Sequence, residues 1–161
     1  MRAVGASALG HLADLGPLCM RVGVGAVFAV HGWQKFDTIG VANFAKFLDS
    51  LGVPAPETVA WIQTFVEGIG GLLLIAGFMT RLVTIPLIGI LVGAIWLVKV
   101  DVGFVVGTGN GAELETGLIA ALLGLLFVGP GRLSIDGALG METAVAPVGG
   151  RRVTTREPET T

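Results

Sequence analysis

Ionisable residues inside otherwise apolar segments are the places where this sequence could do chemistry. An ionisable group at membrane depth is costly unless it is paired or hydrated, so it marks either a structural ion pair or a functional site. At about 100° per residue, Arg21, His31 and Lys35 fall on one face of a single helix. We expect that face to point into the protein.

Two acidic residues on later segments are predicted to join this face. Glu67 lies about nine residues into a second apolar segment, roughly 14 Å deep, at a depth similar to that of His31 on the antiparallel first segment. Glu113 opens a further apolar segment from the same side. The sequence therefore predicts an outer polar cluster of His31, Lys35, Glu67 and Glu113.

Two interpretations of the outer polar cluster stay open. In the first, Glu67 and His31 are catalytic residues that exchange protons or hydrogen-bond a carbonyl ligand, and Lys35, Glu113 and Arg21 help to bind that ligand. In the second, two acids and two bases neutralise one another and hold the helices in register without chemistry. No cluster with metal-ligand spacing accompanies these residues, so no metal site is expected.

A second group of charges falls on the opposite, inner side: Arg21, Arg81, Arg132 and Asp136. Arginines near the ends of membrane spans commonly reach lipid headgroups and fix the topology. Arg81, Arg132 and Asp136 are therefore predicted to have structural roles.

Four apolar segments must position these side chains, at about residues 15–33, 58–79, 82–98 and 114–129. Each has close to the 17–25 residues that a bilayer crossing needs. The composition, 53% hydrophobic and 14% charged, lies outside the usual balance of a water-soluble domain. The predicted fold class is an all-α integral membrane four-helix bundle over residues 1–140, followed by a disordered cytoplasmic tail over 141–161.

The connections between these segments are also readable. Apolar residues at helical spacing over 41–51 predict an amphipathic helix that lies in the outer interface between spans one and two. Thr80 and Arg81 are predicted to form a tight turn between spans two and three. The glycines at 68–71 are expected to serve close helix packing, and Gly89 and Gly93 are expected to let a neighbouring helix approach closely.

Basic residues near the span ends predict the orientation. Six arginines share one side and three lysines share the other, which favours cytoplasmic N- and C-termini in a multi-pass protein of the plasma membrane.

Several functions are excluded by composition. The net charge of −2 and the lack of a basic stripe argue against nucleic acid as a partner. Cys19 is the only cysteine, so one copy cannot carry out dithiol chemistry, and we expect it to be buried filler. His11 and His31 would lie about 30 Å apart along a helix, too far to ligate one haem. No motif for a covalent or nucleotide cofactor occurs.

The order and spacing of several motifs resemble the DoxX family of membrane proteins, which is related to the small subunits of thiosulfate:quinone oxidoreductases. The resemblance covers about residues 15–139. It rests on these motifs: Arg21 followed by His31-Gly32-Trp33-Gln34-Lys35-Phe36, Gly52-Val53-Pro54-Ala55-Pro56, Glu67-Gly68-Ile69-Gly70-Gly71, Gly77-Phe78-Met79-Thr80-Arg81, Gly111-Ala112-Glu113, and Gly129-Pro130-Gly131-Arg132-Leu133-Ser134-Ile135-Asp136. Leu114 and Leu133 stand where the family commonly has an aromatic residue.

The resemblance implies a subunit or membrane platform of an oxidoreductase complex that handles thiol, thiosulfate or oxidative-stress chemistry, with a quinone as the cofactor near His31 and Glu67. The implied partners are membrane lipid, soluble or membrane oxidoreductases, and further copies of the chain. Two alternatives of other classes stay open. One is a non-enzymatic membrane scaffold, and the other is a small-solute carrier or channel that acts as an oligomer, suggested by charged groups on facing helices.

Overall fold

The computed structural model describes residues 15–100, 102–105 and 111–141, and all of its regular structure is helical. The predicted tail, apart from Met141, lies outside the described residues. The elements in chain order are α2 (Leu15–Trp33), η1 (Gln34–Thr38), α3 (Val41–Ser50), α4 (Pro56–Ala76), α5 (Thr80–Ala94), η2 (Ile95–Lys99), α6 (Glu113–Val128) and α7 (Ile135–Ala138). The two η elements are single π-helical turns that continue α2 and α5 directly.

Within the described residues, three helices are long and apolar enough to cross a membrane: Leu15–Thr38, Pro56–Ala76 and Thr80–Lys99. These match the first three predicted spans. The fourth predicted span forms α6, but its 16 residues give only about 24 Å of helix at 1.5 Å per residue, less than a typical hydrocarbon core of about 30 Å. The all-helical prediction is therefore confirmed, and four full crossings are not.

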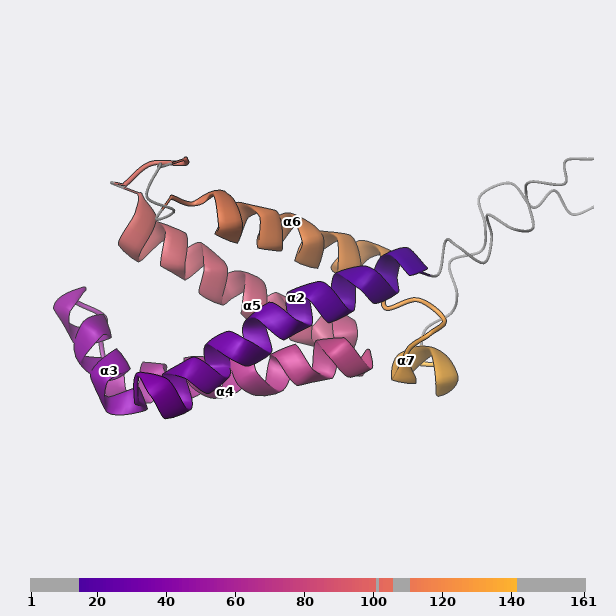
Figure 1. Cartoon of the computed structure of the whole chain (residues 1–161), viewed down its shortest axis with the longest axis horizontal. Coiled ribbons are helices and arrows are strands. Elements are labelled where there is room, and N and C mark those ends of the chain that lie inside the picture. Colours follow the sequence, from indigo (N-terminus) through magenta and orange to yellow (C-terminus); the bar gives the residue numbers. More distant parts are fainter. Residues whose placement is uncertain (1–14, 101, 106–110, 142–161) are drawn as a thin grey trace, which may run out of the picture.

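The long helices pack in pairs. α2 lies along α4, and α5 lies along α6, with α4 and α5 also in contact (Figure 1). The short helices lie at opposite ends of this arrangement: α3 crosses the end where α2 finishes, and α7 lies at the end where α2 begins. We call these the α3 end and the α7 end.

Glycines let α2 and α4 pack in near backbone contact. A Cβ atom on Gly32 would lie 2.3 Å from the backbone nitrogen of Gly68, and one on Gly71 would lie 2.4 Å from the backbone nitrogen of Ala29. The predicted packing role of the 68–71 glycines is thus confirmed. The same expectation is wrong for Gly89 and Gly93, because a Cβ on either would meet no described atom within 4 Å.

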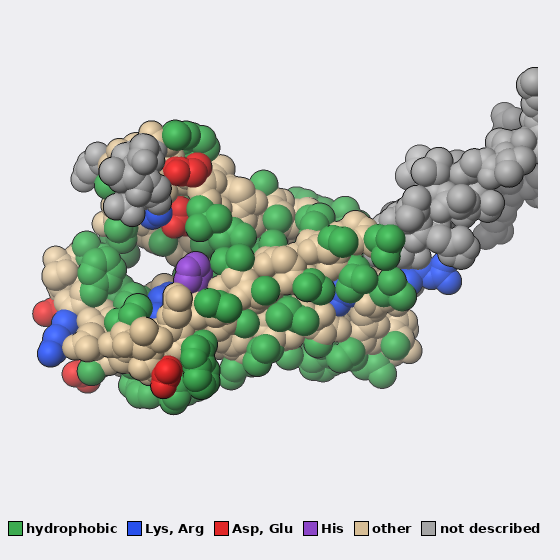
Figure 2. All heavy atoms as spheres, in the orientation of Figure 1, with side chains coloured by type: hydrophobic (Ala, Val, Ile, Leu, Met, Phe, Trp, Pro, Cys, Tyr) green, Lys and Arg blue, Asp and Glu red, His purple; other side chains and the backbone are tan. Residues whose placement is uncertain are grey.

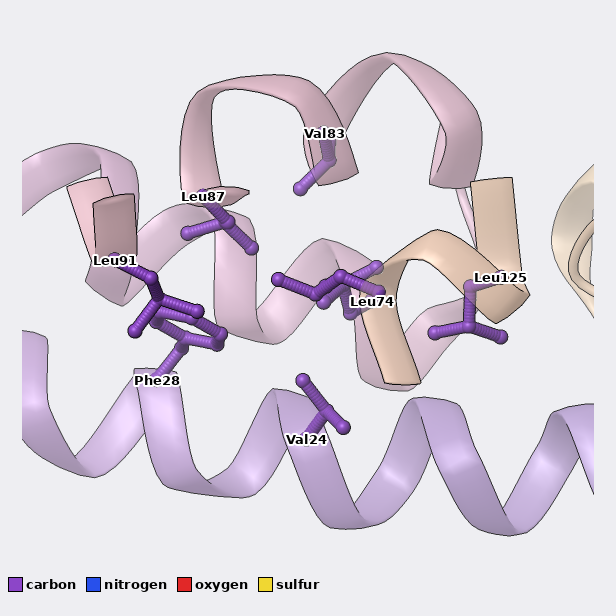
Figure 3. Close-up of a cluster of buried hydrophobic side chains, with 8 residues drawn as sticks. Val24, Phe28, Leu74, Val83, Leu87, Leu91 and Leu125 are labelled. Atoms are coloured by element: carbon purple, nitrogen blue, oxygen red, sulfur yellow. The ribbon is translucent and has the colours of Figure 1, made fainter. Parts of the chain in front are cut away.

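The apolar core lies where the four longer helices meet. In Figure 3, side chains of α2 point toward Leu74 of α4, with residues of α5 and α6 closing the cluster. Its buried members are Val24, Phe28, Leu74, Val83, Leu87, Leu91, Leu122 and Leu125.

The turn between α4 and α5 is formed by Gly77 to Met79. Gly77 and Met79 adopt left-handed backbone conformations, with φ of 70° and 50°. The prediction that Thr80 and Arg81 form this turn is wrong, because both lie in the first turn of α5. Glycine adopts the left-handed conformation that ends a helix more readily than other residues do. The turn therefore begins at Gly77, before Thr80 and Arg81.

The outer surface of the long helices is strongly apolar. Hydrophobic side chains cover the sides of the molecule in Figure 2, and Ile62, Leu72 and Leu82 are each more than half exposed. Cys19 is exposed among them, so its predicted burial is wrong. A surface of this kind suits lipid as the surrounding solvent.

Aromatic side chains mark the α3 end of this surface. Trp33, Phe36, Trp61 and Phe65 form a chain of ring contacts, with neighbouring centroids 5.5–6.4 Å apart. Exposed tryptophans of this kind are enriched at membrane interfaces. The α3 end is therefore expected to lie at a membrane–water boundary.

Candidate functional site

A buried ion pair joins α4 to the π-helical turn at the end of α2. The Nζ of Lys35 lies 2.5 Å from Oε2 of Glu67, and the two side chains are only 15% and 5% exposed. The other carboxylate oxygen, Oε1, accepts a hydrogen bond of 3.2 Å from the side-chain amide of Gln63. The Lys35 ammonium also lies 4.8 Å from the centre of the Phe44 ring, within the range of a cation–π contact. We call Lys35, Glu67 and Gln63 the polar triad.

Helix packing places the polar triad deep in the molecule. Glu67 stands near the middle of α4, about 16 Å of helix from Pro56 and about 14 Å from Ala76. Lys35 lies three residues beyond Gly32, whose backbone touches Gly68 one residue after Glu67. The π-helical turn that carries Lys35 is a rare local structure that often accompanies functional sites.

His31 does not join the polar triad. Its side chain is exposed, and within the described residues it forms no hydrogen bond or ion pair with Glu67. The predicted meeting of His31 with Glu67 is therefore absent. The reason is that Gly32 occupies the centre of the contact with α4, and a neighbouring residue is rotated by about 100° away from it.

Glu113 is also separate from the polar triad. It begins α6 at the α3 end, where its backbone N–H donates to the carbonyl of Phe104. Its neighbour Glu115 forms a second ion pair, 2.9 Å from the Nζ of Lys99, which also donates to the Gly111 carbonyl at 2.8 Å. Of the predicted outer polar cluster, only Lys35 and Glu67 come together, and His31 and Glu113 lie outside that ion pair. The second ion pair is formed by two residues that the predicted cluster did not include.

Arg21 lies at the α7 end and is only 1% exposed. Its guanidinium donates to the backbone carbonyls of Ile75, at 3.2 Å, and of Leu133. The expectation that this arginine reaches lipid headgroups is wrong, because the end of α4 and the segment before α7 enclose it. It lies at the opposite end from the polar triad, so it does not contribute to a ligand site there.

Asp136 is buried at the α7 end, beside the start of α5. Its two carboxylate oxygens accept from the backbone N–H groups of Met79, at 2.8 Å, and Thr80, at 3.0 Å, and so cap the start of α5. Arg81 and Arg132 are exposed at the same end, and their topological role stays a prediction.

A groove of about 530 Å³ opens beside the polar triad at the α3 end, where Figure 2 shows the molecule hollowed. Among the described residues that line it, Lys35 alone is charged, and Gln63 adds an amide. The other lining residues are apolar or glycine and come from three elements and their extensions: Phe44, Phe47, Leu48, Leu51 and Val53 around α3, Val59, Ile62 and Val66 of α4, and Pro86, Gly89, Ile90, Gly93, Ala94, Leu97 and Val98 of α5 and η2. A largely apolar cavity with a few polar groups is the usual form of a small-molecule site.

Three site residues are not found by sequence reasoning. Gln63 stands four residues before Glu67 and therefore on the same helical face, which is a signal that could have found it. For Lys99 and Glu115 the sequence offers no such signal, because nothing near either residue shows that α6 returns beside η2.

Comparison with known proteins identifies the family of the chain. The DoxX family model matches residues 16–100, which include the whole polar triad. The chain belongs to the DoxX family. It is 34% identical over 131 residues to an uncharacterized membrane protein of Mycobacterium tuberculosis, with 74% of this chain and 78% of that protein covered.

A second relative of this DoxX protein carries a functional name. A Bacillus subtilis protein named "Putative oxidoreductase CatD" is 34% identical over 123 residues, covering 76% of this chain and 86% of its own length. No solved structure matches the chain.

Proposed function

We propose that this DoxX protein is the quinone-binding membrane subunit of an oxidoreductase complex in the plasma membrane. The observation that carries the proposal is the burial of the Lys35–Glu67 pair beside an apolar groove. The name of the Bacillus subtilis relative supports the oxidoreductase class.

The polar triad has the donors that a neutral carbonyl ligand requires. The Lys35 ammonium has three N–H groups and the Gln63 amide has two, and each gives one to Glu67. The remaining donors can bind a quinone carbonyl that enters from the groove. Because Glu67 balances the charge of Lys35, the site favours an uncharged head over an anion.

Reduction of a quinone takes up two electrons and two protons. The electrons are expected from a partner oxidoreductase or from its reduced sulfur substrate. The Lys35 ammonium is the group placed to give one proton to the carbonyl oxygen, and the Glu67 carboxylate beside it can take up a replacement proton from water and so restore the net charge of the pair. The second proton comes from water. In this proposal His31 stays outside the proton-transfer step.

The proposed topology is four crossings with cytoplasmic N- and C-termini. The lysine-bearing α3 end would then face outward, and the α7 end, with Arg81 and Arg132, would face the cytoplasm. α6 would cross with the help of its flanking residues or of local bilayer thinning. A reporter that works only in the cytoplasm should be active when it is fused after Thr161, and activity of an exported reporter there would contradict this orientation.

Quinone binding in lipid nanodiscs tests the proposed site. The double variant Lys35→Met/Glu67→Gln keeps the net charge of the pair and should weaken binding by at least about tenfold, the effect of losing a hydrogen bond to a charged donor. The matched control is Lys46→Met/Glu57→Gln, which changes one exposed lysine and one exposed glutamate. Unchanged binding and complex activity in the first variant would exclude the polar triad as the site.

A further inference from the structure

The short helix α7 and the residues beside it carry their polar side chains inward and their apolar side chains outward. Ser134 and Asp136 are buried, whereas Leu133, Ile135 and Leu139 are 55%, 43% and 62% exposed. A segment that faces water has the opposite pattern. The exposed side of α7 therefore suits an apolar neighbour. We call this exposed set the α7 apolar face: Leu133, Ile135, Leu139 and Met141.

Hydrogen bonds fix this orientation of α7. The backbone N–H of Asp136 donates to the Gly77 carbonyl at 3.0 Å. The Asp136 carboxylate accepts from the backbone N–H groups of Met79 and Thr80. Because these bonds hold the buried side of α7 against the start of α5, the α7 apolar face cannot turn inward without breaking them.

The same contacts place α7 at the edge of the hydrocarbon core of a membrane. Figure 1 shows α7 beside the ends of the long helices. Thr80 begins α5, which continues through η2 to Lys99, a run of 20 residues and about 30 Å of helix. This length equals the typical thickness of a hydrocarbon core, about 30 Å. Since Asp136 binds the first residue of that run, α7 lies level with one boundary of the core.

The exposed charges near the α7 apolar face are arginines. Among the described residues, four charged ones lie at the α7 end: Arg21, Arg81, Arg132 and Asp136. Arg21 and Asp136 are buried, and Arg81 and Arg132 are exposed. An arginine beside an exposed apolar face matches a surface that carries phosphate groups above hydrocarbon.

We propose that α7 is an interfacial anchor. It inserts the α7 apolar face into the lipid leaflet at the α7 end, and Arg132 binds the phosphate groups of anionic lipids there. The exposed Phe127 and Val128 at the end of α6 extend the lipid-facing surface of the long helices toward Leu133, so one lipid layer covers both. The anchor also carries the chain from the short helix α6 to the boundary of the core.

Depth-dependent quenching tests the insertion, using the full-length Cys19→Ser protein in nanodiscs of phosphatidylcholine and phosphatidylglycerol. A fluorophore on Leu139→Cys should be quenched by lipids brominated on their acyl chains and shielded from aqueous iodide. Asp49→Cys is the matched control, because this exposed residue lies on the polar side of the other short helix, α3. The same label there should be quenched strongly by iodide. Leu133→Cys repeats the test if the first variant does not fold.

Lipid retention tests the role of Arg132. The purified protein in detergent should retain phosphatidylglycerol in preference to phosphatidylcholine. Arg132→Gln should lower this preference by about fivefold, which corresponds to about 1 kcal/mol for one basic residue at an anionic surface. Arg132→Lys keeps the charge and should preserve most of the preference.

The outcomes separate lipid from the other occupants of the α7 apolar face. Iodide quenching at position 139 equal to that at position 49 would place the face in water and overturn the proposal. Shielding from iodide without quenching by brominated lipid would also overturn it and assign the face to a protein partner, such as a second copy of the chain. Equal lipid preference in Arg132→Gln and the wild type would overturn the contact with anionic headgroups.

Discussion

The Lys35–Glu67 pair should show itself as a large coupling energy between two residues 32 positions apart. Glu67→Gln removes the carboxylate from a lysine that is only 15% exposed. Breaking a buried ion pair by removing one partner costs about 3–5 kcal/mol. The Phe44 ring already lies 4.8 Å from the ammonium in the wild type, so its cation–π contribution is common to both proteins and cancels. We therefore expect Glu67→Gln to lower the free energy of unfolding by about 3–5 kcal/mol.

A double-mutant cycle separates the interaction energy of Lys35 with Glu67 from the effect that each substitution has on the surrounding residues. Lys35→Met alone should cost a similar amount, because it leaves Glu67 charged and without its cation. The combination Lys35→Met/Glu67→Gln should recover most of the loss, since it leaves no unpaired charge, which gives a coupling energy of about 2 kcal/mol or more. Reversible unfolding in mixed micelles measures the free energy of unfolding of the wild type, the two single variants and the double variant. Glu57→Gln, which changes an exposed glutamate, serves as the control. A coupling energy within about 0.5 kcal/mol of zero would refute a buried ion pair at this place.

Two further predictions concern the scaffold. Gly32→Ala should destabilise the protein by about 1–3 kcal/mol, because its Cβ would lie 2.3 Å from a backbone nitrogen of α4. Gly23→Ala, whose Cβ would meet no described atom within 4 Å, should be neutral or slightly stabilising in the same unfolding assay, and equal losses would contradict the close α2–α4 contact. Asp136→Ala should cost about 1–2 kcal/mol by removing the cap of α5. The exposed Asp49→Ala should cost less than half as much, and an equal effect would argue against the cap.

The course of the chain could be predicted because long apolar runs have few structural solutions. The four predicted spans match α2, α4, α5 and α6 to within a few residues, and the amphipathic pattern over 41–51 matches α3. The prediction of four membrane crossings was less accurate than the prediction of four helices. The reason is that α6 is too short to meet the length criterion for a membrane span, which the other three helices meet. Apolar composition indicates which segments are helical but does not show how completely each one crosses a bilayer.

The candidate site was only partly predictable. The helical positions of Lys35 and Glu67 indicated that they could meet, and in the structure they form an ion pair. The same reasoning placed His31 in the polar cluster with Glu67. It did so because the angle of a residue around a helix does not show which residue lies at the centre of the contact between α2 and α4. That residue is Gly32, selected by its lack of a side chain.

Hydrogen bonds from side chains to the backbone were not predicted from the sequence. Arg21 donates to the carbonyls of Ile75 and Leu133, which any residue type could supply at those positions. The groove was not predicted from the sequence either, for a related reason. Glycines that pack against a helix, such as Gly71, and glycines that line a cavity, such as Gly89, have the same sequence signature.

Photolabelling tests the central claim most directly. A quinone that carries a photoreactive group on its head, reconstituted with the protein in nanodiscs, should label residues of α3 and α4 around Gln63 and Phe44, and excess unlabelled quinone should compete. Labelling should fall sharply in Lys35→Met/Glu67→Gln, the variant that removes both charges together. Labelling spread over the lipid-facing side chains, without competition and unchanged in the double variant, would contradict a quinone site at the polar triad.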